Sequence, residues 1–115
     1  MGSVCIFCKI INKEIKADIL FENESLLAFK DINPQAPIHI LIIPKEHIVN
    51  VAQLTEQHSD LAGRMILLGR SLAEKKGISE SGFRLVLNCN RDGGQAVDHI
   101  HLHLLGGRAM LWPPG

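Results

Sequence analysis

The sequence has little aromatic content and no surplus of either charge. Its 115 residues include four Phe, one Trp and no Tyr, so the core must be built mainly from aliphatic side chains. Twelve Lys and Arg balance twelve Asp and Glu, which leaves no general field to attract nucleic acid or an anionic membrane. We therefore expect neither partner, and any recognition of phosphate must be local.

Long apolar runs are also missing. No window approaches the roughly 18 apolar residues that cross a bilayer, and no signal-peptide core opens the chain. The cysteines Cys5, Cys8 and Cys89 are odd in number, which argues against a disulfide framework. The expectation that follows is a reduced, cytoplasmic environment.

The length fits one domain, 1–115, which ends in a C-terminal tail, 106–115. Apolar spacing, caps and turn residues predict one short helix, one long helix and five strands. The expected helices are 5–13 and 55–76, and the expected strands are 19–22, 26–31, 39–43, 83–89 and 99–105. Short turns between strands, with one long helix on one face, predict an α+β fold with a five-stranded antiparallel sheet.

The most informative segment is His99-Ile100-His101-Leu102-His103, which holds half of the six histidines. Because side chains alternate along a strand, the three imidazoles share one face and the apolar residues face the core. Three interpretations compete: a solvated strand, a metal site and nucleophilic catalysis. The pattern lacks the preceding acidic ligand that a catalytic zinc site prefers, since Asp98 points to the opposite face.

Phosphoryl chemistry favours nucleophilic catalysis. A neutral imidazole nitrogen can attack phosphorus in line while flanking N–H donors stabilise charge on the other oxygens. Just upstream, Gly93-Gly94-Gln95-Ala96 offers unhindered backbone N–H groups that can form a local anion nest. Together the two segments predict a nucleotide-processing enzyme with His101 as the nucleophile.

The alternation from His99 to Leu105 resembles the signature of the histidine triad (HIT) family, and its context is similar to the Hint branch. The resemblance covers nearly the whole chain and includes Ile6-Phe7, Phe29 to Ile32, Asn33-Pro34-Gln35-Ala36-Pro37, Gly93-Gly94-Gln95, Leu105-Gly106-Gly107-Arg108 and Trp112-Pro113-Pro114-Gly115. It implies a HIT-like fold and a hydrolase of purine nucleoside phosphoramidates (AMP- or GMP-amine P–N bonds). Such an enzyme would act through a nucleotidylated His101 and would require no cofactor for catalysis.

The resemblance also implies roles at the site. His103 would contact a phosphate oxygen, while His99 and His39 would complete and orient the site. Asp31 would accept hydrogen bonds from the ribose hydroxyls. The remaining residues would hold the purine (Phe7, Ile10, Phe29, Ile32, Leu41) or lie near the phosphate (Asn88, Gly94, Gln95, Ala96, Val97). Taken singly, each apolar residue of this set is more typical of ordinary core.

Two positions depart from the family pattern. Ala96 stands where Ser is common, which removes a hydroxyl near the leaving group and predicts slower turnover of amine leaving groups or a changed preference among them. Asp98 stands where an aromatic residue is common and predicts a weaker contact between subunits or at a sheet edge.

Cys5 and Cys8 are three residues apart, so both thiols can face one way on a helical turn. A thioredoxin-like pair is disfavoured, because that motif follows a strand in a βαβ unit. Two thiolates with two imidazoles would make a tetrahedral structural zinc site, and two buried, reduced thiols are the alternative. Histidine triad relatives with this cysteine pair suggest His47 and His99 as the other two ligands.

Three alternatives to a phosphoramidase remain open. Two belong to the same family: a dinucleoside polyphosphate hydrolase, which the Trp112-Pro113-Pro114-Gly115 ending disfavours, and a nucleotidyltransferase. The third is a non-catalytic nucleotide-binding interaction protein, which the intact histidine row and Asp31 disfavour and Ala96 allows.

A two-fold homodimer is expected as well. One small subunit provides too little cover for the apolar 83–89 strand. The long helix also carries Ile66 and Leu67 beside its apolar stripe of Leu61, Met65, Leu68 and Leu72, so it needs cover on more than one side. The tail is too apolar for a solvated segment, and the resemblance implies that it carries Trp112 toward the substrate site of the partner.

Overall fold

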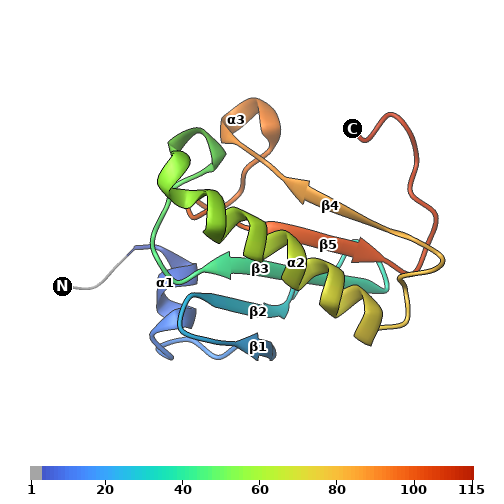
Figure 1. The fold of residues 1–115 in the computed structure, drawn as a ribbon, viewed down its shortest axis with the longest axis horizontal. Helices are drawn as coiled ribbons and strands as arrows, with labels where there is room; N and C mark the ends of the chain where they lie inside the picture. The colour runs from blue at the N-terminus through green and yellow to red at the C-terminus, as the bar shows by residue number, and fades with distance from the viewer. Residues whose placement is uncertain (1–3) are drawn as a thin grey trace.

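The computed structural model describes residues 4–115, and this part of the chain contains five strands and three α-helices (Figure 1). The strands are β1 (Ile19–Glu22), β2 (Leu26–Lys30), β3 (Ile38–Pro44), β4 (Phe83–Leu87) and β5 (Leu102–Gly106). The helices are α1 (Ile6–Ile11), α2 (Ser59–Lys75) and the single turn α3 (Asn90–Gly93), and two 3₁₀ turns, Val51–Gln53 and Glu56–His58, precede α2. Among these described residues, no helix combines the length and the apolar character that crossing a membrane requires.

The strands form one antiparallel sheet in the order β1-β2-β3-β5-β4. This arrangement confirms the predicted α+β fold with a five-stranded antiparallel sheet and one long helix. The central strand β3 pairs with β5 so that Leu41 lies opposite His103 and His39 lies opposite Leu105. Since residues two apart share a face, this register brings His39 and His103 to the same face from distant parts of the chain.

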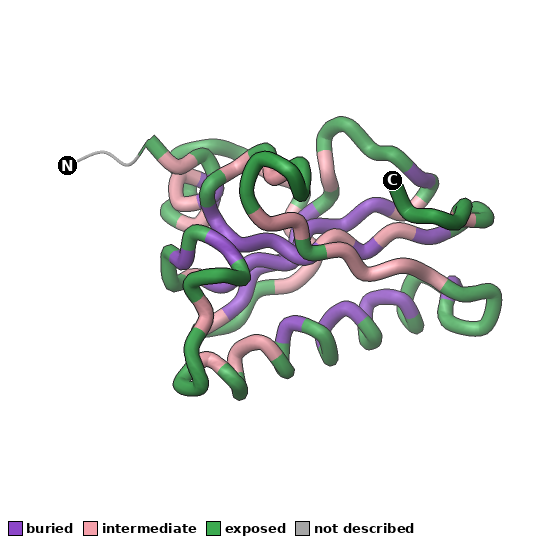
Figure 2. The backbone as a smooth tube through the Cα atoms, turned by 90° about the horizontal axis from the view of Figure 1, so that it is seen from above, coloured by how far each residue is buried: buried purple, intermediate pink, exposed green. Residues whose placement is uncertain are grey.

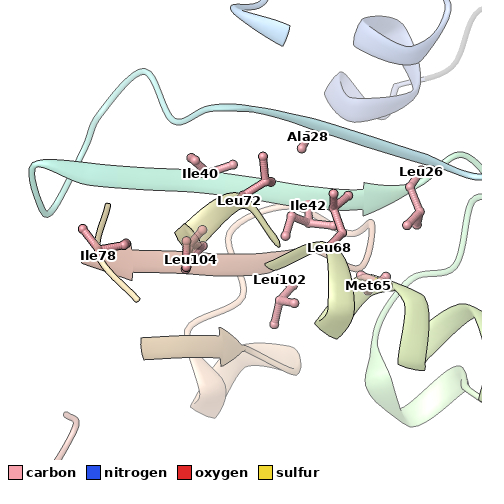
Figure 3. Packing of buried hydrophobic residues seen from close by; sticks show 11 residues of the cluster. Leu26, Ala28, Ile40, Ile42, Met65, Leu68, Leu72, Ile78, Leu102 and Leu104 are labelled. Carbon is pink, nitrogen blue, oxygen red and sulfur yellow. The ribbon is translucent and has the colours of Figure 1, made fainter. Parts of the chain in front are cut away.

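Helix α2 packs along one face of the sheet (Figures 1 and 2). Its inward stripe meets apolar residues from β2, β3 and β5 in a cluster that includes Met65, Leu68, Leu72, Ile42, Leu102 and Leu104 (Figure 3). Burial of each such side chain contributes about 1.5–3 kcal/mol. Gly69 permits the close approach, because a Cβ there would lie 3.1 Å from Cδ2 of Leu85. This face is occupied by packing, so any chemistry belongs to the other face.

The opposite face carries a second, smaller apolar cluster. Phe7 and Ile10 of α1 pack there against side chains of β2 and β3, namely Leu27, Phe29, Leu41 and Ile43. The six-residue helix α1 is much shorter than α2 and therefore covers less of the sheet.

The helix boundaries differ from the predicted ones by a few residues. The long helix begins at Ser59, because Thr55 caps the preceding 3₁₀ turn, where its side chain accepts from the backbone N–H of Gln57. The first helix spans 6–11 rather than 5–13, because Cys5 is its N-cap and accepts from the N–H of Cys8. The predicted turn at 90–94 contains the short helix α3.

Among the strands, the last one shows the largest shift, since it spans 102–106 rather than 99–105. Its pairing with β3 ends at Leu102 opposite Ile42. Beyond that point His99 bonds through its side chain to the carbonyl of Pro44, and Ile100 donates its N–H to Ile48. Strand 19–22 has the predicted bounds, while the strands predicted at 26–31, 39–43 and 83–89 run 26–30, 38–44 and 83–87. Gly106 belongs to β5 rather than to the tail.

Candidate active site and metal centre

A cavity of about 420 Å³ opens on the sheet face that carries α1. This size is typical of small-molecule sites. The predicted site residues among its lining are apolar (Phe7, Ile10, Phe29, Ile32, Leu41, Ala96, Val97) or polar (Asp31, His39, His101, His103). The fold therefore gathers most of the predicted nucleotide site around one cavity.

The other predicted site residues lie outside this lining. The side-chain amide of Gln95 is used within the protein, since its Nε2 donates to the carbonyls of Val49 and Val97. Gly94 ends α3 in the left-handed region, and Asn88 lies half-buried after β4. Trp112 is 82% exposed, and the side chain of His99 faces the cluster of cysteines and histidines described below.

Several lining residues were missed by sequence reasoning. They are Ile6 from α1, Ile15, Lys16 and Ala17 from the loop after it, Lys30 at the end of β2, and Asn33 and Gln35 from the loop before β3. The loop residues have no periodic pattern that reveals which way they face, whereas Ile6 lies at helical spacing from Ile10 and carries that signal.

The geometry of His101 fixes which of its nitrogens is available. Its side chain is buried, with 5% exposed, and the edge-on ring of Phe7 lies 5.1 Å away between ring centroids. Nδ1 lies 2.7 Å from the backbone carbonyl of His99. Because a carbonyl only accepts, Nδ1 must carry the hydrogen in the neutral ring. Nε2 then keeps its lone pair, as a nucleophile requires.

A relay of two hydrogen bonds places the ring hydrogen of His103 on Nε2, whereas that of His101 lies on Nδ1. The backbone N–H of Gln35 donates to Nδ1 of His39 at 3.0 Å, so the hydrogen of His39 lies on Nε2. That Nε2 lies 2.9 Å from Nδ1 of His103 and donates to it. The hydrogen of His103 therefore lies on its Nε2, which is buried without a partner. A buried donor of this kind is suited to an incoming oxygen of a ligand.

Burial keeps both relay histidines neutral. It lowers the pKa of His103 to about 4, to which the nearby His101 and His39 contribute, while Asp31 opposes the shift. Burial also lowers the pKa of His39, again against Asp31, whose Oδ2 lies 3.4 Å from Nε2 of His39. The tautomers deduced from the hydrogen bonds therefore apply at neutral pH.

A second cluster joins Cys5 and Cys8 to His47 and His99, whose four donor atoms all lie within 4.8 Å of one another. Nδ1 of His99 is 3.4 Å from Sγ of Cys5 and 3.1 Å from Nδ1 of His47. Sγ of Cys8 is 3.2 Å from Nδ1 of His47. Nε2 of His99 donates to the Pro44 carbonyl at 2.8 Å, so its Nδ1 lone pair faces the cluster.

This donor set fits zinc. Zn–S and Zn–N distances near 2.3 and 2.0 Å imply that donor atoms on a tetrahedron are separated by about 3.3–3.8 Å. Four of the six donor-to-donor separations are 3.1–3.6 Å, close to that range, and the other two are within 4.8 Å. One imidazole is already oriented by a carbonyl, as is usual for metal-bound histidines.

Asp31, His39 and His103 also place donor atoms within 4.8 Å of one another. A metal on Nε2 of His39 would move the ring hydrogen to Nδ1, where it would face the N–H of Gln35. This trio therefore fits a hydrogen-bond relay better than a metal site.

Comparisons with known proteins match nearly the whole chain. A family model described as "Scavenger mRNA decapping enzyme C-term binding" matches residues 4–111. The purine nucleoside phosphoramidase of Escherichia coli is 50% identical over 110 residues, which are 96% of this chain and 92% of that protein. A 14 kDa zinc-binding protein of Zea mays is 49% identical, covering 98% of this chain and 89% of that one. The crystal structure of a HIT family hydrolase from Legionella pneumophila has a TM-score of 0.95 and 53% identity, and the match covers 96% of this chain and 99% of that chain.

Proposed function

Because this chain belongs to the histidine triad family, we propose that it hydrolyses purine nucleoside phosphoramidates, cleaving the P–N bond between AMP or GMP and an amine. The observation that carries the proposal is the pair of complementary nitrogens at the cavity. His101 keeps a lone pair on Nε2, and His103 keeps an unpaired N–H. A relative at 50% identity is named for this activity, which supports the choice of substrate.

The proposed reaction has two displacements at phosphorus. In the first, Nε2 of His101 forms a bond to the α-phosphorus while the P–N bond breaks and the amine leaves with a proton from water. In the second, water attacks phosphorus, the bond to His101 breaks, and the nucleoside monophosphate and a proton are released. The carbonyl of His99 stabilises the charged ring between the two steps, and His103 donates to a phosphate oxygen.

A substrate panel tests the proposal. We expect adenosine and guanosine phosphoramidates to be hydrolysed with a higher kcat/KM than a dinucleoside polyphosphate. Preference for the polyphosphate would instead favour that branch of the family. Binding of AMP without hydrolysis of any member of the panel would favour a non-catalytic nucleotide-binding protein.

Asp31 is proposed to read the ribose hydroxyls, which predicts a preference for ribonucleotides. It lines the cavity, and one of its oxygens already accepts from the N–H of Asn33 at 2.8 Å, which fixes the carboxylate. A fixed carboxylate that loses its hydroxyl partner costs affinity, so we expect dAMP to bind at least about tenfold more weakly than AMP. Calorimetric titration with both nucleotides measures the ratio, and equal affinities would remove this role from Asp31.

We also propose one structural zinc ion per subunit, held by Cys5, Cys8, His47 and His99. Metal binding stabilises the folded state because the unfolded chain has no preformed site. Elemental analysis of protein purified without a metal-affinity tag should give one zinc per chain, and a chelator should lower Tm by several degrees. Absence of zinc together with an unchanged Tm would assign Cys5 and Cys8 as ordinary packed thiols.

A homodimer is proposed from the apolar surface that one subunit leaves uncovered. On α2, Ile66 and Leu67 are 50% and 60% exposed, and the edge strand β4 leaves Leu87 exposed. Burying such residues against a second copy would remove apolar area from water. Sedimentation at micromolar concentration should therefore give twice the chain mass, and a monomer would end the proposal.

The tail is proposed to reach the partner's site. Within the subunit it runs beside β4, where Arg84 donates to the carbonyl of Leu111, while the Trp112 side chain stays exposed. Truncation after Arg108 should change the relative kcat/KM for phosphoramidates with different amine leaving groups, compared with the parent protein. An unchanged preference would place Trp112 away from both sites.

A further inference from the structure

Helix α1 forms part of the wall of the nucleotide cavity but has little intrinsic stability. Ile6, Phe7 and Ile10 of this helix line the cavity. A helix of six residues is far below the length that is stable by itself in water, so it must be held by contacts with the rest of the protein.

The Cys5, Cys8, His47 and His99 cluster includes two residues at the first turn of this helix. Cys5 is the N-cap and Cys8 lies in the first turn, while the other two ligands come from outside the helix. His47 follows β3 and His99 precedes β5, so a bound ion would connect α1 to the segments next to β3 and β5.

Phe7 lies between the two cysteines in sequence and contacts side chains of both the cysteine–histidine cluster and the cavity. Its ring centroid is 5.9 Å from that of His99, 5.1 Å from that of His101 and 5.5 Å from that of Phe29. The same side chain therefore contacts a metal ligand, the proposed nucleophile and the apolar wall of the cavity.

We infer that metal binding at Cys5, Cys8, His47 and His99 controls the affinity of the cavity for nucleotides, because the metal anchors α1. This inference rests on the proposed function, since it takes the cavity lined by Phe7 as the nucleotide site. Without the ion, Cys5 meets His99 at 3.4 Å and Cys8 meets His47 at 3.2 Å through thiol–imidazole contacts, and a thiol is a weak hydrogen-bond donor. If about one tenth of metal-free molecules keep α1 docked, the apparent affinity falls about tenfold.

The test compares zinc-loaded and chelated protein in two measurements. AMP binding is measured by calorimetry, and the docking of α1 is measured by hydrogen exchange of the backbone amides of residues 5–17. We expect chelation to weaken AMP binding about tenfold or more and to speed exchange in this segment, and we expect added zinc to reverse both effects.

Two variants separate the metal from the cavity wall. His47→Gln removes a ligand that belongs neither to α1 nor to the lining of the cavity, so it should reproduce the effect of chelation and respond little to further chelator. Cys89→Ser is the matched control, because Cys89 lies after β4 and outside the cluster, and it should behave as the parent protein. Circular dichroism checks that both variants fold, and if His47→Gln does not, the reversible chelation of the parent protein decides.

Unchanged AMP affinity and unchanged exchange of residues 5–17 after complete removal of zinc would overturn the inference, as would a protein that takes up no zinc. Failure of the proposed function looks different. In that case zinc-loaded protein does not hydrolyse phosphoramidates, while the dependence of α1 exchange and AMP binding on zinc is still observed.

Discussion

Replacement of His101 by Ala is expected to lower the turnover of an adenosine phosphoramidate by about 10⁴-fold or more. The residue supplies the only nitrogen at the cavity, among the described residues, that the hydrogen bonds show to hold a free lone pair in a buried ring. Alanine removes the nucleophile and leaves the apolar wall and Asp31 in place. AMP binding should therefore remain within a few-fold of the parent value, because the lost interaction belongs to the transition state.

Single-turnover kinetics with calorimetry on the same preparations separates the two effects. His58→Ala is the matched control, since His58 lies in the 3₁₀ turn before α2 and outside the cavity. Turnover near the parent rate in His101→Ala would remove His101 as nucleophile. A loss of AMP binding equal to the loss of rate would show that the residue supports the cavity rather than the chemistry.

Replacement of His103 by Phe is expected to lower kcat by about 10²–10³-fold, the usual effect of removing one preorganised donor from a developing charge. Phe keeps a planar ring in the half-buried site but has no N–H for the phosphate oxygen. It also leaves Nε2–H of His39 without its acceptor.

His103→Gln separates these two roles, because its amide offers both an acceptor and a donor. We expect this variant to retain more activity than His103→Phe, as measured by kcat under saturating substrate. Equal and small losses in both variants would mean that the unpaired N–H does not meet the transition state.

The sequence predicts which histidines and cysteines come together, because their grouping depends on simple periodicities. Alternation along a strand predicts that His99, His101 and His103 share a face. Only His103 lies in β5, but Phe7 of α1 contacts the rings of His99 and His101, and the ring of His101 contacts that of His103. The spacing of Cys5 and Cys8 predicts two thiols on one helical turn, and they lie there beside His47.

The interactions that set the chemistry do not follow from the sequence. The N–H of Gln35 and the carbonyls of Pro44 and His99 determine which nitrogen of each histidine carries its hydrogen. Every residue has a backbone carbonyl and every residue except proline has a backbone N–H, so no residue type signals these three partners. They are defined by tertiary structure alone.

The segment Gly93-Gly94-Gln95-Ala96 shows that glycine content alone does not predict an anion-binding loop. Its glycines suggest an open nest of N–H groups, but the chain forms the short helix α3 that Gly94 terminates at φ 78°. Gln95 then bridges three segments, because its Oε1 accepts from Asn90 and its Nε2 donates to Val49 and Val97. Only Ala96 and Val97 of the predicted phosphate loop reach the cavity lining.

The double position of His99 changes how substitutions in the histidine row have to be interpreted. The group that holds His101 is the main-chain oxygen of residue 99, which every amino acid supplies, while the imidazole of His99 faces the cysteines. Alanine substitutions along the row therefore measure different things. Under the proposed function, position 101 reports on bond making at phosphorus, whereas position 99 reports on the contacts of its imidazole with Cys5, Cys8 and His47. Activity that is lost at position 99 and regained by stabilising the protein would indicate a structural role, although His99 is the first histidine of the row.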